Sequence, residues 1–273
     1  MEWSWLQLLL YGFISGFGEF LPVSAESHRV MLQLFYGGGN DAGLLRFCVH
    51  ISALLAVLLA NRHLIGRIRR EQKIAALPPR KRRRRPDAAI LMLWRMIKIS
   101  AIPLLLSFLL YGKGMEYQSV LWLHSLLLVI NGAVLYLPQF MLRGNKDARA
   151  MSPWDAVLIG ASSALSMLPG ISRTGMAASV GMMRGCDRRY AVDYAVLLSV
   201  PALIVMSVLD LFAIGGGATL GFGSCVMVMA AAFAGGYLSV LALRFLSAKT
   251  GLAGFAYYSW GIALFMLILF LTI

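Results

Sequence analysis

The sequence carries little charge for its length. Only 14% of the 273 residues are charged, and acidic residues are the scarcer kind, with 12 Asp and Glu against 25 Lys and Arg. Hydrophobic residues make up 59% of the chain, and the mean hydropathy is +0.75. This composition excludes a soluble domain with one large core. It predicts an all-α polytopic membrane protein.

Cysteine is also rare. Cys48, Cys186 and Cys225 lie far apart, in or next to apolar segments. Their spacing matches neither a disulfide framework nor a metal-thiolate site, so we expect them to be small packing residues. We expect no cleaved signal either, because Trp3–Tyr11 has neither a basic start nor a small-residue cleavage site.

Most of the net charge of +13 is concentrated in one stretch, Arg62–Arg95. Because the basic residues are not spread over a fold, they do not predict a nucleic-acid-binding surface, and no nucleic-acid partner is expected. The positive-inside rule instead places this stretch on the cytoplasmic side, together with basic clusters near Arg143, Arg188 and Lys249. Contact with anionic lipid head groups is a second interpretation of the same stretch.

One stretch, Leu168–Gly175, is polar and helix-breaking within an otherwise apolar region. Pro169 lacks a backbone donor, and Gly170 permits dihedrals that other residues resist. Irregular backbone at membrane depth persists only where it is buried in protein or lines a wet cavity. The guanidinium of Arg173, beside free N–H groups at the start of the next helix, predicts a phosphate clamp. The alternative is a packing kink with Arg173 reaching to the interface.

A second stretch, Gly18–His28, interrupts an apolar run in the same way, with Leu21-Pro22 followed by hydroxyl groups. Its charged side chains are carboxylates and an imidazole. Interruptions at corresponding places in two halves of a membrane protein predict a midplane site built by inverted repeats. We expect a single integral membrane domain, 1–273, with repeats at 1–142 and 143–273.

The apolar runs predict six transmembrane helices plus two re-entrant helical hairpins in an inverted repeat, each half being a hairpin followed by three spans. The hairpins are expected at Trp3–Tyr36 and Trp154–Met183, and the spans at Leu44–Ala60, Ala88–Tyr111, Val120–Leu142, Tyr190–Ile214, Ser224–Leu246 and Phe255–Leu271. A single kinked span is the alternative for Trp3–Tyr36. Loops are expected at 37–40, 113–118 and 215–223. All basic clusters then fall on one side, which supports this arrangement.

At the two interrupted stretches, the chain resembles the undecaprenyl-diphosphate phosphatase family of the bacitracin-resistance type. The matching residues are Gly16, Glu19, Phe20, Leu21, Pro22, Val23, Ser24 and His28 in the first stretch, and Pro169, Gly170, Ser172, Arg173, Thr174 and Gly175 in the second. Weaker matches near His50, Pro201 and Gly235 extend the resemblance over the whole length. It implies the same fold, in which two re-entrant hairpins meet inside the membrane.

The resemblance implies hydrolysis of undecaprenyl diphosphate, a C55 polyprenyl diphosphate, to the monophosphate during lipid-carrier recycling for peptidoglycan synthesis. The site would lie towards the outer face of the bacterial cell membrane, with the basic loops in the cytoplasm. The implied partners are the lipid substrate and the bilayer, and a homodimer is left open. A non-hydrolytic polyprenyl-phosphate transporter or binder is the second hypothesis, because broken midplane helices are also transporter architecture.

The family's motifs, carried over residue by residue, give the candidate site. The catalytic candidates are Glu19, Ser24, His28 and Arg173 from the motifs, with Glu26 and Ser27 added from positions that depart from them, and the phosphate-binding candidates are Gly170, Ser172, Arg173, Thr174 and Gly175. Glu19 would act as a base or, with Glu26, as a ligand of a divalent cation, Mg²⁺ or Ca²⁺. His28 would serve as base, acid or nucleophile. The attacking group stays open among Ser24, Ser27, His28 and a water.

The chain departs from the family's pattern at six positions. These are Ser15 for the family's first Glu, Ala25 for the second hydroxyl of its Val-Ser-Ser run, Glu26 and Ser27 at two positions that are usually small, Arg46 for an acidic residue at the start of the first span, and Ser163 for a Gln before the second motif. One carboxylate and one hydroxyl, a candidate nucleophile, are therefore missing. Glu26 and Ser27 directly follow Ala25, and the hypothesis is that they restore both groups from new positions.

Overall fold

The structure is a computed structural model that describes residues 3–36, 41–110, 112, 116–117, 119–214 and 219–272. Within these ranges it contains helices and no β-strand, which confirms the predicted all-α class. The α-helices are α1 (Trp5–Gly18), α2 (Ala25–Tyr36), α3 (Ala42–Ala60), α4 (Arg62–Ala76), α5 (Ala88–Ser107), α7 (Leu121–Tyr136), α8 (Pro153–Ala164), α9 (Arg173–Met183), α10 (Arg188–Ala213), α11 (Phe222–Thr250) and α12 (Ala253–Thr272). The expected loops at 37–40, 113–118 and 215–223 lie wholly or partly outside the described residues.

Six helices in the described ranges are long and apolar enough to cross a membrane, as predicted. They are α3, α5, α7 with its 3-10 extension Leu137–Phe140, α10, α11 and α12. Their bounds agree with the expected spans to within a few residues, which is the usual uncertainty of a helix end. The chain is therefore a multi-pass membrane protein.

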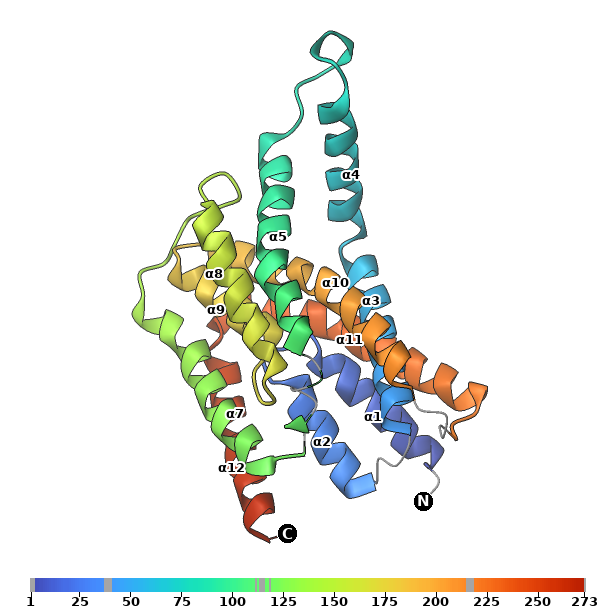
Figure 1. Ribbon diagram of the computed structural model, residues 1–273. Helices are drawn as coiled ribbons and strands as arrows, with labels where there is room; N and C mark the ends of the chain where they lie inside the picture. The colour runs from blue at the N-terminus through green and yellow to red at the C-terminus, as the bar shows by residue number, and fades with distance from the viewer. Residues whose placement is uncertain are drawn as a thin grey trace.

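Two pairs of shorter helices occupy the places of the expected hairpins. Helices α1, α2, α8 and α9 have 14, 12, 12 and 11 residues, too few to cross the hydrocarbon core at 1.5 Å per residue. In each pair the second helix contacts the first, α2 with α1 and α9 with α8, as expected for a helical hairpin. Figure 1 shows α1 and α2 in the lower half of the molecule and α8 above them.

Each hairpin turns at a proline-containing break whose backbone leaves the usual dihedral range. After Pro22, Ser24 has a φ of +59°, and after Pro169, Gly170 has a φ of +95°. A non-glycine residue at positive φ is uncommon and costs conformational energy, so surrounding contacts must hold Ser24 in place. The breaks thus end α1 and the 3-10 turn after α8 within the protein interior.

Helices from the two halves pack against each other in matched pairs. Helix α1 packs on α11 and α8 packs on α5, so each hairpin lies against the second span of the other half. First spans also pair, α3 with α10, and third spans pair, α7 with α12. Glycines allow the closest approaches: a Cβ at Gly16 would lie 2.2 Å from the Ala232 carbonyl oxygen, and one at Gly160 would lie 2.1 Å from that of Ser100.

We expect Gly160→Ala to lower the melting temperature in detergent by several degrees. The added methyl group would overlap the α5 backbone, and overpacking of this kind typically costs about 1–3 kcal/mol. Gly261→Ala is the matched control, because a Cβ at this helical glycine meets no atom within 4 Å. Equal melting temperatures for the two variants would contradict the close packing of α8 on α5.

The basic stretch after α3 forms a helix that its charge pattern did not predict. It forms α4, which projects with the start of α5 beyond the other helices (Figure 1). Glu71 accepts hydrogen bonds from the Arg84 guanidinium and from the Asp87 N–H at 2.9 Å. The hydrogen bond from Arg84 is the main reason that the pKa of Glu71 falls to about 2. This carboxylate therefore ties the segment after α4 back onto the helix.

Candidate active site

The two breaks meet at the centre of the protein and are joined by hydrogen bonds. Thr174 Oγ1 donates to the carbonyl oxygen of Phe20 at 2.8 Å, and Ser172 Oγ donates to that of Leu21 at 3.2 Å. Asn131 on α7 accepts from the Ser172 N–H at 2.9 Å. The hydroxyl groups of Ser172 and Thr174 thus fasten one hairpin to the other.

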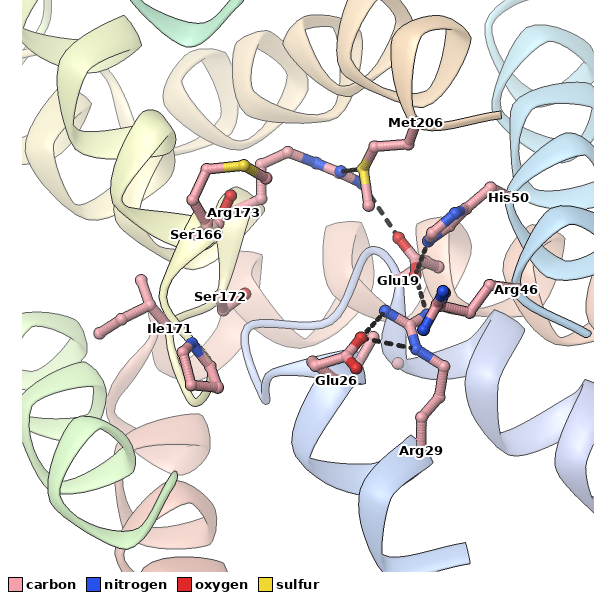
Figure 2. A pocket seen from close by; sticks show the side chains of 14 residues that line it. Glu19, Glu26, Arg29, Arg46, His50, Ser166, Ile171, Ser172, Arg173 and Met206 are labelled. Atoms are coloured by element: carbon pink, nitrogen blue, oxygen red, sulfur yellow. Dashed lines mark hydrogen bonds and ion pairs between the residues drawn. The ribbon is translucent and has the colours of Figure 1, made fainter. Parts of the chain in front are cut away.

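A pocket lies beside this junction and is lined by charged side chains from both hairpins and from α3 (Figure 2). The charged and imidazole residues that line it are Glu19, Glu26, Arg29, Arg46, His50 and Arg173. The first turns of α2 and α9 also face it, through Ala25 and Ser172. Helix N-termini carry partial positive charge and free N–H groups, so two of them at one pocket favour an anionic ligand.

Glu19 lies at the centre of the charged residues. Its Oε1 is 2.6 Å from Arg29 Nη1 and 3.4 Å from His50 Nε2, and its Oε2 is 3.0 Å from Arg173 Nη2. The Glu19 side chain is only 3% exposed. A carboxylate buried this deeply needs such partners, because an unpaired charge would be very costly to bury. Glu19 therefore holds two guanidinium groups in place on opposite sides of the pocket.

Arg173 has hydrogen-bonding capacity that the described residues do not use. Its Nη2 donates to Glu19, and its Nη1 lies 2.9 Å from the thioether sulfur of Met206, a weak acceptor. Its Nε is buried and has no hydrogen-bond partner within the described part of the chain. A buried donor without a partner is unfavourable, so the guanidinium is suited to receive an oxygen-rich anion.

His50 is hydrogen-bonded to a second buried carboxylate. Its Nδ1 is hydrogen-bonded to Asp210 on α10, whose side chain is fully buried. Arg46 Nε lies 3.4 Å from the other oxygen of Asp210. The Nε2 of His50 lies on the pocket side, 3.4 Å from Glu19 Oε1, which is too long for a strong hydrogen bond. A carboxylate behind an imidazole fixes its tautomer and orientation, which is the arrangement of a general acid–base group.

Three of the predicted catalytic residues do not line this pocket. Ser27 Oγ lies 3.2 Å from Ser24 Oγ and 3.0 Å from His124 Nδ1 on α7. His28 Nδ1 is hydrogen-bonded to the Ser24 carbonyl oxygen, and its Nε2 lies 2.7 Å from the hydroxyl of Tyr258 on α12. His28 and Tyr258 line a separate, mainly apolar pocket. The structure therefore brings Glu19, Glu26, Ser172 and Arg173 together and directs Ser24, Ser27 and His28 elsewhere.

Comparison with known proteins shows the family to which the chain belongs. Residues 8–265 match the family described as bacitracin resistance protein BacA. The chain belongs to this family. A protein from a Nocardioides species is 32% identical over 249 residues, which are 90% of each chain. A Methanobrevibacter smithii protein is 30% identical over 269 residues, 96% of each chain, and both are named undecaprenyl-diphosphatase.

Two glycines of the BacA motifs shape the break and do not line the pocket. Gly170 packs on α7, where a Cβ would lie 2.9 Å from the His124 carbonyl oxygen. Gly175 packs on Pro22, where a Cβ would lie 2.8 Å from the proline Cβ. Ala25, at the position of the family's second serine, does line the charged pocket. A hydroxyl is therefore absent at a position that faces the site.

Sequence reasoning overlooked Arg29 and Asp210. Arg29 follows His28 directly and lies three residues after Glu26, a spacing that pairs opposite charges on one helix face. Asp210 is a carboxylate within an apolar span, which is by itself a functional signal in a membrane protein. Arg46, noted as a departure from the family, lies beside Asp210, so the charge at that position has a partner from α10.

The two carboxylates expected to bind a divalent cation do not fit one in this arrangement. Glu19 and Glu26 are both paired with Arg29, which lies between them. Two further guanidinium groups, those of Arg46 and Arg173, line the same pocket and would repel a cation. No group of three His, Cys, Asp or Glu residues in the described ranges is arranged to hold a metal ion. We therefore derive no catalytic step through a metal.

Proposed function

We propose that this protein hydrolyses undecaprenyl diphosphate to undecaprenyl phosphate and inorganic phosphate. The observation that carries the proposal is the buried Arg173 guanidinium, which has unused donors beside the N-termini of α2 and α9. This site suits a phosphate group, and the family relatives are named undecaprenyl-diphosphatase. Those names do not favour the non-hydrolytic transporter that the sequence left open.

The proposal includes a membrane orientation. The two hairpins are re-entrant and belong to inverted repeats, and the matched packing of α1 on α11 and α8 on α5 supports this. The basic α4 and the start of α8 face the cytoplasm. Arg46 lies about one turn from the end of α3 that is opposite α4, so the pocket opens towards the outer face of the cell membrane.

In the proposed reaction the diphosphate enters the pocket and its oxygens accept hydrogen bonds from Arg173 and from the first turns of α2 and α9. A water attacks the terminal phosphorus, since Ala25 offers no hydroxyl and Ser24 and Ser27 are hydrogen-bonded outside the pocket. The new P–O bond forms as the bond to the bridging oxygen breaks. His50 takes the proton of the water, and the bond's electron pair leaves with the prenyl monophosphate.

The experiment is phosphate release from undecaprenyl diphosphate by the purified chain in detergent. We expect steady release of one phosphate per lipid, with undecaprenyl phosphate as the other product. A protein that binds the lipid without releasing phosphate, in any buffer, would overturn the hydrolase and leave a binding role. Labelled water adds a second readout, because attack at the terminal phosphorus places its oxygen in the released phosphate and not in the undecaprenyl phosphate.

A further inference from the structure

Arg29 occupies the place between the two carboxylates of the pocket. Its Nη1 lies 2.6 Å from Glu19 Oε1, and its Nη2 and Nε lie 2.5 and 2.9 Å from Glu26 Oε2. Figure 2 shows the guanidinium between the two acids. The Arg29 side chain is 4% exposed, so the group is withdrawn from water almost completely. The contact is therefore part of the pocket wall and not a surface ion pair.

Paired carboxylates near a phosphate usually bind a metal ion, but here an arginine lies between them. Two acids that converge on one point bind a hard divalent cation, which then neutralises phosphate oxygens. Here the converging point already holds a positive charge that cannot be removed, because arginine stays protonated in proteins. Glu26 fixes Arg29 by a two-bond contact from the same face of α2, three residues earlier.

The Arg29 guanidinium has N–H groups that remain able to donate to a ligand. Three of its five N–H groups donate to Glu19 and Glu26, which leaves two. Arg173 contacts the other oxygen of Glu19. Two guanidinium groups thus flank one carboxylate, and oxygens of a bound diphosphate would accept hydrogen bonds from both. This is the task that a metal ion performs between two phosphate groups.

We propose that Arg29 takes the place of a divalent cation, so that the pocket binds the diphosphate and supports its hydrolysis without a metal ion. The proposal rests on the phosphatase function proposed above. It assigns Glu26, a departure from the family's pattern, the role of fixing Arg29 and not of binding metal. Arg29 and Glu26 then act as one unit on the first turns of α2.

The first test uses the wild-type chain in detergent after treatment with EDTA. Phosphate release in EDTA should stay within about twofold of release with added Mg²⁺ or Ca²⁺, because the charge is supplied by the protein. Release that disappears in EDTA and returns with either ion would overturn the proposal. A chain that releases no phosphate under any condition would instead contradict the hydrolase itself.

The second test measures binding and does not depend on activity. Mg²⁺ or Ca²⁺ at millimolar concentration should leave the melting temperature of the wild type unchanged. Arg29→Met removes the guanidinium and leaves Glu19 and Glu26 facing each other, so each ion should raise the melting temperature of this variant. Cation-induced stabilisation of the wild type would overturn the proposal, whatever the activity assay shows.

Control variants separate this role from a loss of folding. Arg69→Met removes a basic residue from α4, away from the pocket, and should change neither cation response nor phosphate release. Arg29→Met with Glu26→Gln leaves one carboxylate and should lose the new cation response while still folding. If Arg29→Met folds, as its melting transition shows, and gains no response to either ion, the carboxylates do not form a latent cation site and the proposal fails.

Discussion

Arg173→Ala should reduce phosphate release from undecaprenyl diphosphate by about a thousandfold, the upper end of what one positioned donor contributes to charge stabilisation. The substitution removes the unused donors that face the pocket and leaves Glu19 with Arg29 and His50 as its remaining partners. The substitution should lower kcat and weaken substrate binding together. The same guanidinium binds the diphosphate in the ground state and stabilises the negative charge that develops in the transition state. Initial rates over a range of lipid concentrations measure both.

Arg173→Lys sharpens this test. A lysine keeps the charge but lacks the planar fork, so it should recover only a small part of the activity. Arg189→Ala, at the exposed start of α10, removes an arginine of the same sequence region and should leave the rate unchanged. Activity within about threefold of wild type for Arg173→Ala, in a variant that still melts cooperatively, would exclude the phosphate clamp.

The pattern of apolar runs predicted the spans well, because each span needs a run of apolar residues as long as the bilayer is thick. Helix α5 illustrates this: it begins at Ala88, as expected, shortly after the run of basic residues that ends at Arg85. Helix α4 was not foreseen, since its residues form a surface helix tied to later residues. A contact such as Glu71 with Arg84 depends on how the chain returns, which no local pattern specifies.

The sequence predicted which motif residues lie near the site, but not the directions in which their side chains point. Glu19 and Arg173 meet because both breaks converge, as the two interruptions at corresponding places in the sequence predicted. Ser24 has a positive φ, and the turn that results sends its hydroxyl to Ser27 and its carbonyl oxygen to His28. A sequence motif cannot show such a local reversal, because the same residues in the usual β or α region would point to another side.

Buried ion pairs between distant spans were the least predictable part of the site. His50 and Asp210 are 160 residues apart and meet through the packing of α3 on α10. The sequence offered a signal for each residue separately, a charged or imidazole group within an apolar span. Pairing them required knowing that first spans face each other across the two halves.

The pairing of His50 with Asp210 gives the second large expected effect. His50→Gln should lower kcat by about a hundredfold to ten-thousandfold, the range that general acid–base groups contribute, with a smaller change in KM. Asp210→Asn should lower kcat less, since the imidazole remains but its tautomer and orientation are no longer fixed by a carboxylate. Steady-state rates with undecaprenyl diphosphate check both.

Asp193→Asn is the matched control for this pair. Asp193 lies on the same helix, α10, but is half-exposed and bonded to Arg244 on α11. Its substitution should leave kcat unchanged, whereas a loss equal to that of Asp210→Asn would indicate a general effect on α10. If His50→Gln keeps a wild-type kcat while folding normally, the proton of the attacking water goes to another group. Glu19, 3.4 Å from His50 Nε2, would then be the residue to substitute next.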